Sequence, residues 1–149
     1  MGRILCFDYG LKRIGVAVTD NLRIISTPLV TCGSAEIFDF IFKYTNENEV
    51  DLFLVGMPYD LKGNPTDSTK QTIKFIEKLN NKYPGIKTDT YDERYTSKIA
   101  KDSLIMMGKN KKYRRKKSNI DKISASIILQ SYLTSKKWYI QLDFMGIRY

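Results

Sequence analysis

The sequence predicts an α/β fold in which a mixed five-stranded sheet is flanked by helices. Short apolar runs near the N-terminus are typical of strands joined by hairpins. Strand-like and helix-like segments then alternate, which favours parallel strands with helices on both faces of the sheet. The chain has 149 residues, the size of one domain with one core. We therefore expect three antiparallel strands followed by parallel ones.

Apolar runs and alternation predict the first three strands. Residues 4–7 are continuously apolar, as in a central strand that is buried on both faces. In residues 13–20 large apolar side chains recur at every second position, namely Ile14, Val16 and Val18, and Gly10 lies in the short turn between these two segments. A third strand is expected within residues 23–31, where Pro28 confines it to a sheet edge or a bulge.

Helices and strands are expected to alternate in the middle of the chain. The apolar residues of segment 37–42 have the spacing of one helical face, and Ser34 is a candidate N-cap for this helix. The apolar run over residues 51–56 predicts another buried strand. A second helix is expected to begin at one of three candidate caps in segment 66–68 and to end at the Pro-Gly pair 84–85.

One more strand and two more helices are expected toward the C-terminus. Residues 86–91 predict a strand, despite their lysine and aspartate content. Thr96 is a candidate cap for a helix that ends near Gly108. Residues 118–133 have the pattern of a long amphipathic helix. This layout is compatible with a ribonuclease H-like core.

The composition excludes several classes of chemistry. The chain has no histidine, so it has no Ser-His or Cys-His nucleophile pair and no Cys₂His₂ zinc site. Cys6 and Cys32 are too few for a disulfide framework, which favours the reducing cytoplasm. The N-terminus lacks the apolar stretch of a signal peptide, and no uncharged apolar run is long enough to span a bilayer. We expect a cytoplasmic protein that does not enter a membrane.

The net charge of +9 favours a polyanionic partner such as nucleic acid. Much of this charge lies in one basic segment, residues 109–117, which contains no acidic residue. Such a segment would attract a phosphate backbone regardless of base sequence, and Tyr113 could stack on an unpaired base. The alternative is a loop that only increases solubility. The expected substrate contacts within this segment are Arg114, Arg115, Lys116 and Lys117.

Two acidic residues lie where predicted strands end. Asp8 follows an apolar strand and precedes a glycine-containing turn that leaves room for a ligand. The alternative for Asp8 is a turn-forming aspartate. Glu93 follows the strand predicted over residues 86–91, and open α/β sheets bind ligands at such strand ends. The alternative is a solvated turn, and the neighbouring Asp92 would point to the other face of the strand.

A third acidic residue, Asp121, lies in the predicted helix over residues 118–133. Because it comes three residues after Ser118, it also fits a helix-capping pattern. It shares one helical stripe with Ala125 and Ile128, however, and is therefore expected to lean toward the sheet. Small residues in the same stretch would let the helix approach the sheet closely, near the strand ends that carry the other two acids.

Convergence of these three carboxylates would require cations to offset their repulsion. Ligation by oxygen alone suits Mg²⁺ or Mn²⁺. Two such ions, about 3.5–4 Å apart, could activate a water and stabilise the leaving oxygen in phosphodiester hydrolysis. Under this hypothesis Asp8, Glu93 and Asp121 are both metal ligands and catalytic residues.

Four blocks resemble one protein family and occur in the family's order. They are residues 7–20 (FDYGLKRIGVAVTD), 55–58 (VGMP), 92–97 (DERYTS) and 121–133 (DKISASIILQSYL). Together they resemble the YqgF family of pre-16S ribosomal RNA nucleases, also described as Holliday-junction-resolvase-like proteins. The resemblance implies a ribonuclease H-like fold and a cytoplasmic bacterial protein that processes the 5′ end of 16S ribosomal RNA during ribosome maturation.

The resemblance also assigns domains and site residues. Asp8, Glu93 and Asp121 match the three acidic residues of the family, and Ser124 stands where the family often has alanine. Residues 1–135 are expected to form the ribonuclease H-like nuclease domain. A C-terminal extension of unknown role, residues 136–149, follows it.

Weaker substrate contacts are predicted beside the acidic residues. Lys12 and Arg13 flank the turn after the first strand and could meet a phosphate, while Gly10 permits close backbone approach. A solvated turn is the alternative. Arg94 could contact a phosphate or pair with its neighbour two residues before it, and Thr96 fits an N-cap as well as a ligand.

Three rival functions remain open from the sequence. The Asp-x-Gly turn at Asp8 also resembles the phosphate-binding hairpin of actin-like ATPases and sugar kinases, but these enzymes need two such domains. Resolution of branched DNA would use the same metal site and a symmetric dimer. A non-catalytic RNA-binding assembly factor would bind RNA without cutting it. We expect pre-rRNA and the ribosomal precursor particle as partners, with monomer and homodimer both open.

Overall fold

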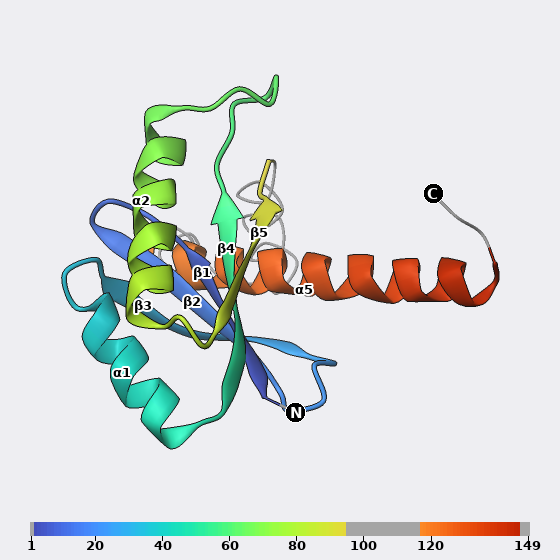
Figure 1. Cartoon of the computed structure of the whole chain (residues 1–149). Helices are drawn as coiled ribbons and strands as arrows, with labels where there is room; N and C mark the ends of the chain where they lie inside the picture. The colour runs from blue at the N-terminus through green and yellow to red at the C-terminus, as the bar shows by residue number, and fades with distance from the viewer. Residues whose placement is uncertain (1, 95–116, 147–149) are drawn as a thin grey trace.

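The computed structural model describes residues 2–94 and 117–146, which contain one five-stranded sheet (Figure 1). The helix expected from Thr96 and most of the basic segment, residues 109–116, lie outside these ranges. None of the helices in these ranges contains an apolar stretch that could span a bilayer.

Three antiparallel strands form one side of the sheet, as predicted. Strand β1 (Arg3–Asp8) pairs with β2 (Arg13–Thr19), and β2 pairs with β3 (Ser26–Gly33), which lies at the edge. The register between β2 and β3 shifts where Ala17 faces Pro28. The prediction that proline confines this strand to an edge or a bulge is therefore confirmed on both counts.

Two parallel strands complete the sheet on the other side of β1. Strand β4 (Val50–Met57) pairs with β1, and β5 (Lys87–Asp92) pairs with β4, so the order is β3-β2-β1-β4-β5. Because β1, β4 and β5 run in the same direction, their C-terminal ends lie at one end of the sheet, the upper end. The N-terminal ends of β1 and β4 form the lower end. The predicted mixed arrangement is confirmed.

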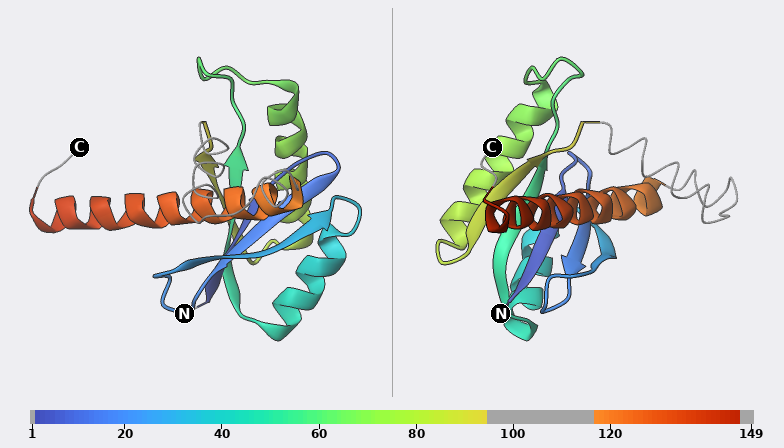
Figure 2. Two further views of the ribbon diagram at one scale, coloured as in Figure 1. Left: turned by 180° about the vertical axis from the view of Figure 1, so that it is seen from behind. Right: turned by 90° about the vertical axis from the view of Figure 1, so that its right-hand side faces the viewer.

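Helices cover both faces of the sheet. Helices α1 (Ile37–Glu47) and α2 (Asp67–Lys82) pack on one face, and α5 (Lys117–Phe144) crosses the other and projects beyond it (Figures 1 and 2). Side chains alternate along each strand, so the sheet has two apolar cores. On β4, for example, Phe53 joins the core under α1 and α2, whereas Leu54 joins the core under α5.

The start of α1 differs from the sequence-based expectation. Its N-cap is Glu36 rather than Ser34. The Ser34 hydroxyl donates a hydrogen bond to the carbonyl of Leu11, and its amide donates to the carbonyl of Lys12, so it closes the β1–β2 turn instead. The expected apolar face was also wrong in one position, because Phe42 is 63% exposed.

The predicted start of α2 is confirmed, whereas α5 continues beyond its predicted end. Thr66, one of the three predicted caps, forms a capping box with Thr69 at the start of α2. Helix α5 includes the predicted segment 118–133 but continues to Phe144. Its backbone therefore runs through the expected domain boundary at residue 135 without a break.

Candidate active site

Asp8 is the last residue of β1, at the upper end of the sheet. Ile4 and Cys6 belong to the core under α5, so alternation places Asp8 on the same face. Asp8 pairs with Gly15 of β2, which lies on that face as well. The central strand of the sheet thus ends in an acidic side chain that faces α5.

Glu93 follows β5 directly and reaches Asp8 across β4. Its amide donates a hydrogen bond to the carbonyl of Met57, which extends the β4–β5 pairing by one step. The Glu93 carboxylate lies over Gly56 of β4, where a Cβ atom would collide with its Oε2 and stand 2.8 Å from Cδ1 of Ile128. The missing side chain at Gly56 therefore provides the space that Glu93 occupies.

The acid before Glu93, Asp92, forms an ion pair with Arg94. Arg94 donates to it from Nε at 2.8 Å and from Nη2 at 2.7 Å. Of the two roles that the sequence left open for Arg94, the structure therefore shows the pairing with Asp92.

The carboxyl groups of Asp8 and Glu93 are hydrogen-bonded to each other. Burial raises the pKa of Asp8 well above its usual range, and the charges of Glu93 and Asp121 raise it further. Burial also raises the pKa of Glu93 to about 7, although the hydrogen bond with Asp8 acts in the opposite direction. The two carboxyl groups therefore titrate as a pair, and burial favours their protonated forms.

Asp121 approaches the site from the first part of α5. Its backbone lies against β2, because a Cβ atom at Gly15 would collide with the carbonyl group of Asp121. Its Oδ2 accepts a hydrogen bond from Nε of Arg13 at 3.2 Å, and the two charges form an ion pair. Asp121 is therefore close enough to raise the pKa of Asp8 while its carboxylate is engaged by Arg13.

The structure brings the three predicted acids to one end of the sheet but does not gather them into one cluster. Within residues 2–94 and 117–146, no three acidic or cysteine side chains are arranged to hold a metal ion. The carboxyl groups of Asp8 and Glu93 contact each other, and the nearby carboxylate of Asp121 is paired with Arg13. The donor set of these acids is oxygen only, which fits a hard divalent cation.

The remaining predicted contacts divide between the site and the undescribed part of the chain. Gly10 and Lys12 lie in the β1–β2 turn at the upper end, and Lys12 is exposed. Lys117 is the first residue of α5. The remaining four predicted contacts lie outside the described residues: Thr96, Arg114, Arg115 and Lys116.

Two glycines position the acids, and the sequence analysis did not assign them this role. Gly15 admits the backbone of α5, and Gly56 admits the Glu93 carboxylate. Each interrupts an otherwise apolar strand, and an isolated glycine in a strand often marks a close approach by another group. That signal was present in the sequence, but it does not say which group approaches.

Comparison with solved structures identifies the fold. The chain resembles Thermus thermophilus RuvC in complex with a Holliday junction substrate, with a TM-score of 0.56 and 10% identity over 92% of this chain and 96% of that one. A second structure of the same organism's RuvC gives a TM-score of 0.52 at 11% identity. The expected ribonuclease H-like fold is therefore confirmed.

Comparison with sequences identifies the family. A family model described as "RuvX: Holliday junction resolvase" matches residues 2–135. A protein of Amoebophilus asiaticus is 47% identical over 94% of this chain and all of its own length. A protein of Phocaeicola vulgatus is 43% identical over 93% of this chain and 99% of its own length. Both carry the name "Putative pre-16S rRNA nuclease". The chain therefore belongs to the RuvX (YqgF) family of nucleases.

Proposed function

We propose that this protein is a metal-dependent endonuclease that processes the 5′ end of pre-16S rRNA during ribosome biogenesis. The observation that carries the proposal is the pair of facing carboxyl groups, Asp8 and Glu93, at the upper end of the sheet. A chain without histidine needs another way to activate water, and carboxylates that bind a divalent cation supply one. The names of the relatives support pre-16S rRNA as the substrate.

The chemistry of the pair supports a divalent cation. Two facing carboxyl groups with raised pKa values would lose their protons to solvent when a divalent cation binds, because the cation offsets both burial and repulsion. Asp8 and Glu93 would hold this cation, with Asp121 as the third ligand. When bound, Mg²⁺ or Mn²⁺ would lower the pKa of a water nucleophile and stabilise charge on the phosphate.

Basic residues of the chain would place the substrate. Lys12 and Arg13 lie at the upper end, beside the acids, where they would contact the phosphate backbone. The basic segment 109–117 ends at the first residue of α5 and would add attraction that does not depend on base sequence. The cytoplasm and the ribosomal precursor particle are the setting that this function requires.

A cleavage assay on precursor RNA tests the proposal. Wild type is compared with Asp8→Asn, Glu93→Gln and Asp121→Asn in Mg²⁺, in Mn²⁺ and in EDTA. Each variant is expected to lose about 100-fold or more of the metal-dependent rate, because each removes an oxygen ligand. Asp51→Asn is the matched control, since it makes the same chemical change at the lower end of the sheet. RNA binding without cleavage by wild type in any metal would contradict the proposal and favour an assembly factor.

A second candidate function is the resolution of branched DNA. The description of the matching family model favours it. It requires a symmetric dimer that cuts two strands, so four-way junctions are assayed beside precursor RNA and the mass in solution is measured. Paired cuts in a junction by a dimer, with intact RNA, would establish this function instead.

A further inference from the structure

One ion pair joins the sheet to α5 at the candidate site. Arg13 is the first residue of β2, and its Nε donates to Oδ2 of Asp121 at 3.2 Å. The Asp121 side chain is 18% exposed and that of Arg13 is 38% exposed. The acid is thus largely enclosed, whereas the guanidinium retains access to solvent at the upper end of the sheet.

The backbone at Asp121 is held in place, so only its side chain can change partner. The carbonyl of Asp121 lies where a Cβ atom of Gly15 would be, and Gly15 pairs with Asp8. The charge of Asp121 already acts on Asp8, because it raises the pKa of that carboxyl. The Asp121 carboxylate therefore has two alternatives within reach, which are Arg13 on one side and the Asp8–Glu93 pair on the other.

Arg13 also explains why the three acids do not form one cluster. A guanidinium neutralises Asp121 without the cost of bringing a third negative charge against the Asp8–Glu93 pair. A divalent cation between the acids would reverse this preference, because it attracts all three carboxylates at once and repels the guanidinium. Arg13 would then lose its partner but stay charged, since arginine does not deprotonate in proteins.

We propose that Arg13 is the resident counter-ion of Asp121, that a divalent cation displaces it, and that the released guanidinium binds a phosphate of the nucleic acid. This inference rests on the proposed metal-dependent function and adds a coupling to it. Arginine suits the second role because its planar group binds phosphate through two hydrogen bonds. Since coupling between two ligands is reciprocal, cation binding strengthens nucleic-acid binding and nucleic acid strengthens cation binding.

The neighbouring basic residues do not fit this role. Arg94 is bonded to Asp92. Lys12 is exposed in the β1–β2 turn, and its ammonium group is a single point charge. Of the described basic residues, Arg13 is the one that pairs with a predicted metal ligand.

Calorimetric titration of the full chain with Mn²⁺, without nucleic acid, tests the displacement. Arg13→Gln is expected to bind Mn²⁺ about fivefold more tightly than wild type, because a partly exposed ion pair no longer competes for Asp121. Arg13→Lys keeps the charge and is expected to lie between the two. Arg23→Gln is the matched control, since Arg23 forms a similar ion pair with Asp51 at the lower end of the sheet. It is expected to leave the Mn²⁺ affinity unchanged.

Binding of a fluorescent single-stranded RNA, in EDTA and in Ca²⁺, tests the coupling. Wild type and Arg23→Gln are expected to bind RNA more tightly in Ca²⁺. Arg13→Gln is expected to lose most of this gain, and its dependence of log affinity on log salt in Ca²⁺ should be shallower by about one. Thermal unfolding of each variant checks that the fold is intact.

The outcomes separate this inference from the function on which it rests. Tighter Mn²⁺ binding by Arg13→Gln, with loss of the Ca²⁺-dependent gain in RNA affinity, supports the displacement. Unchanged or weaker Mn²⁺ binding by a folded Arg13→Gln, while wild type binds the ion, overturns the inference and leaves the nuclease proposal standing. Failure of wild type to bind Mn²⁺, alone or with RNA, overturns both.

Discussion

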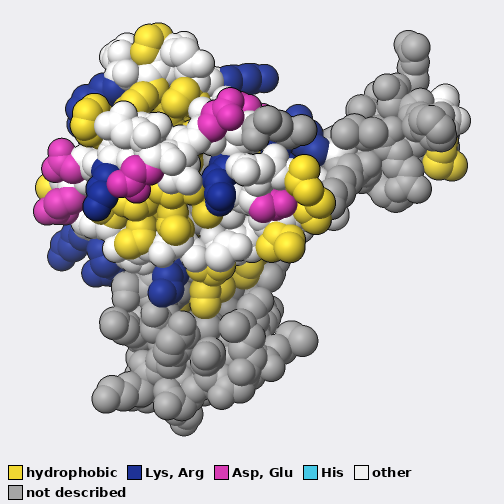
Figure 3. Space-filling view, turned by 90° about the horizontal axis from the view of Figure 1, so that it is seen from below, with side chains coloured by type: hydrophobic (Ala, Val, Ile, Leu, Met, Phe, Trp, Pro, Cys, Tyr) yellow, Lys and Arg dark blue, Asp and Glu magenta, His cyan; other side chains and the backbone are white. Residues whose placement is uncertain are grey.

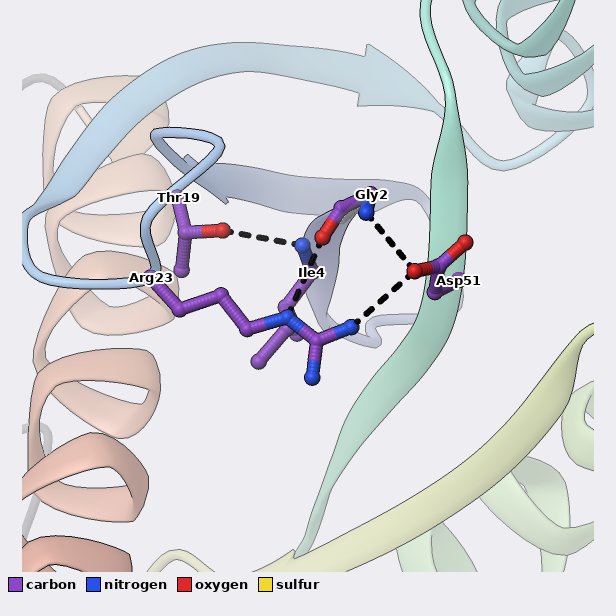
Figure 4. A network of polar contacts seen from close by, with 5 residues as sticks. All are labelled: Gly2, Ile4, Thr19, Arg23 and Asp51. Atoms are coloured by element: carbon purple, nitrogen blue, oxygen red, sulfur yellow. Dashed lines mark hydrogen bonds and ion pairs between the residues drawn. The ribbon is translucent and has the colours of Figure 1, made fainter.

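The two ends of the sheet differ in how their charged side chains are paired. Opposite charges pair at the lower end, whereas acidic groups lie together at the upper end. At the lower end, Asp51 accepts a hydrogen bond from the amide of Gly2 at 2.7 Å and pairs with Nη2 of Arg23 at 3.4 Å (Figure 4). Arg23 also donates from Nε to the carbonyl of Gly2 at 3.1 Å. In the same network, the amide of Ile4 donates to the hydroxyl of Thr19 at 2.9 Å.

At the upper end, by contrast, negative charge accumulates. Asp8 and Glu93 face each other in partly buried positions with raised pKa values, and the charge of Asp121 raises the pKa of Asp8 further. On the surface seen from below, at the lower end, acidic and basic side chains are intermixed (Figure 3). The charges at the lower end thus offset each other, whereas the acidic groups at the upper end repel each other. Carboxyls with strongly raised pKa values are typical of functional sites.

The largest effect on stability is expected from pH in the metal-free protein. The usual pKa of a glutamate is 4.5, and that of Glu93 in the folded protein is about 7. The folded state therefore holds more protons than the unfolded chain between these values, and stability falls as pH rises through 7. Each unit of pKa difference is worth about 1.4 kcal/mol, so the loss is on the order of 3 kcal/mol. Urea unfolding in EDTA at a series of pH values measures it.

Glu93→Gln is the control for this titration, because it removes the charge and keeps the size. The variant is expected to lose less stability than wild type toward alkaline pH and to be the more stable protein at about pH 8. Parallel stability curves for the two proteins would contradict the raised pKa of Glu93 in the folded protein.

A smaller loss is expected when a methyl group is placed at the closest approach between β2 and α5. In Gly15→Ala the new Cβ atom meets the backbone of Asp121 and Lys122, which cannot rotate away. We expect a loss of about 1–3 kcal/mol in the free energy of unfolding, together with weaker Mn²⁺ binding. Gly85→Ala is the matched control, because a Cβ atom there meets no described atom within 4 Å. Equal stability of the two variants would mean that α5 does not lie against Gly15.

The smallest effect is expected at the lower end. Arg23→Gln removes an ion pair whose side chains are 29% and 41% exposed, so it should cost less than about 1 kcal/mol. Metal-dependent cleavage should remain at the wild-type level, since this pair lies at the opposite end of the sheet from Asp8. Thermal unfolding and the RNA cleavage assay measure the two properties. A large loss of activity in this variant would contradict the assignment of the active site to the upper end of the sheet.

Local patterns predicted most of the fold. The five strands, the edge position of Pro28 and the cap at Thr66 follow from short-range rules of chain geometry, and the structure confirms them. Ser34 was predicted wrongly because its hydroxyl could satisfy either a helix end or a turn, and the β1–β2 turn took it. Phe42 has helical spacing like its neighbours, but the width of the buried stripe depends on what α1 packs against.

Local patterns likewise predicted only part of the candidate site. The sequence by itself determined that Asp8 ends a strand, that Glu93 follows one and that Asp121 lies on a helix, since apolar runs and periodicity locate such elements. Tertiary structure alone decided that the carboxyl groups of Asp8 and Glu93 contact each other while that of Asp121 pairs with Arg13. The physical reason is that these contacts join residues far apart in the chain, and their strength depends on burial and on close approach at two glycines, which only the packed sheet and helix define.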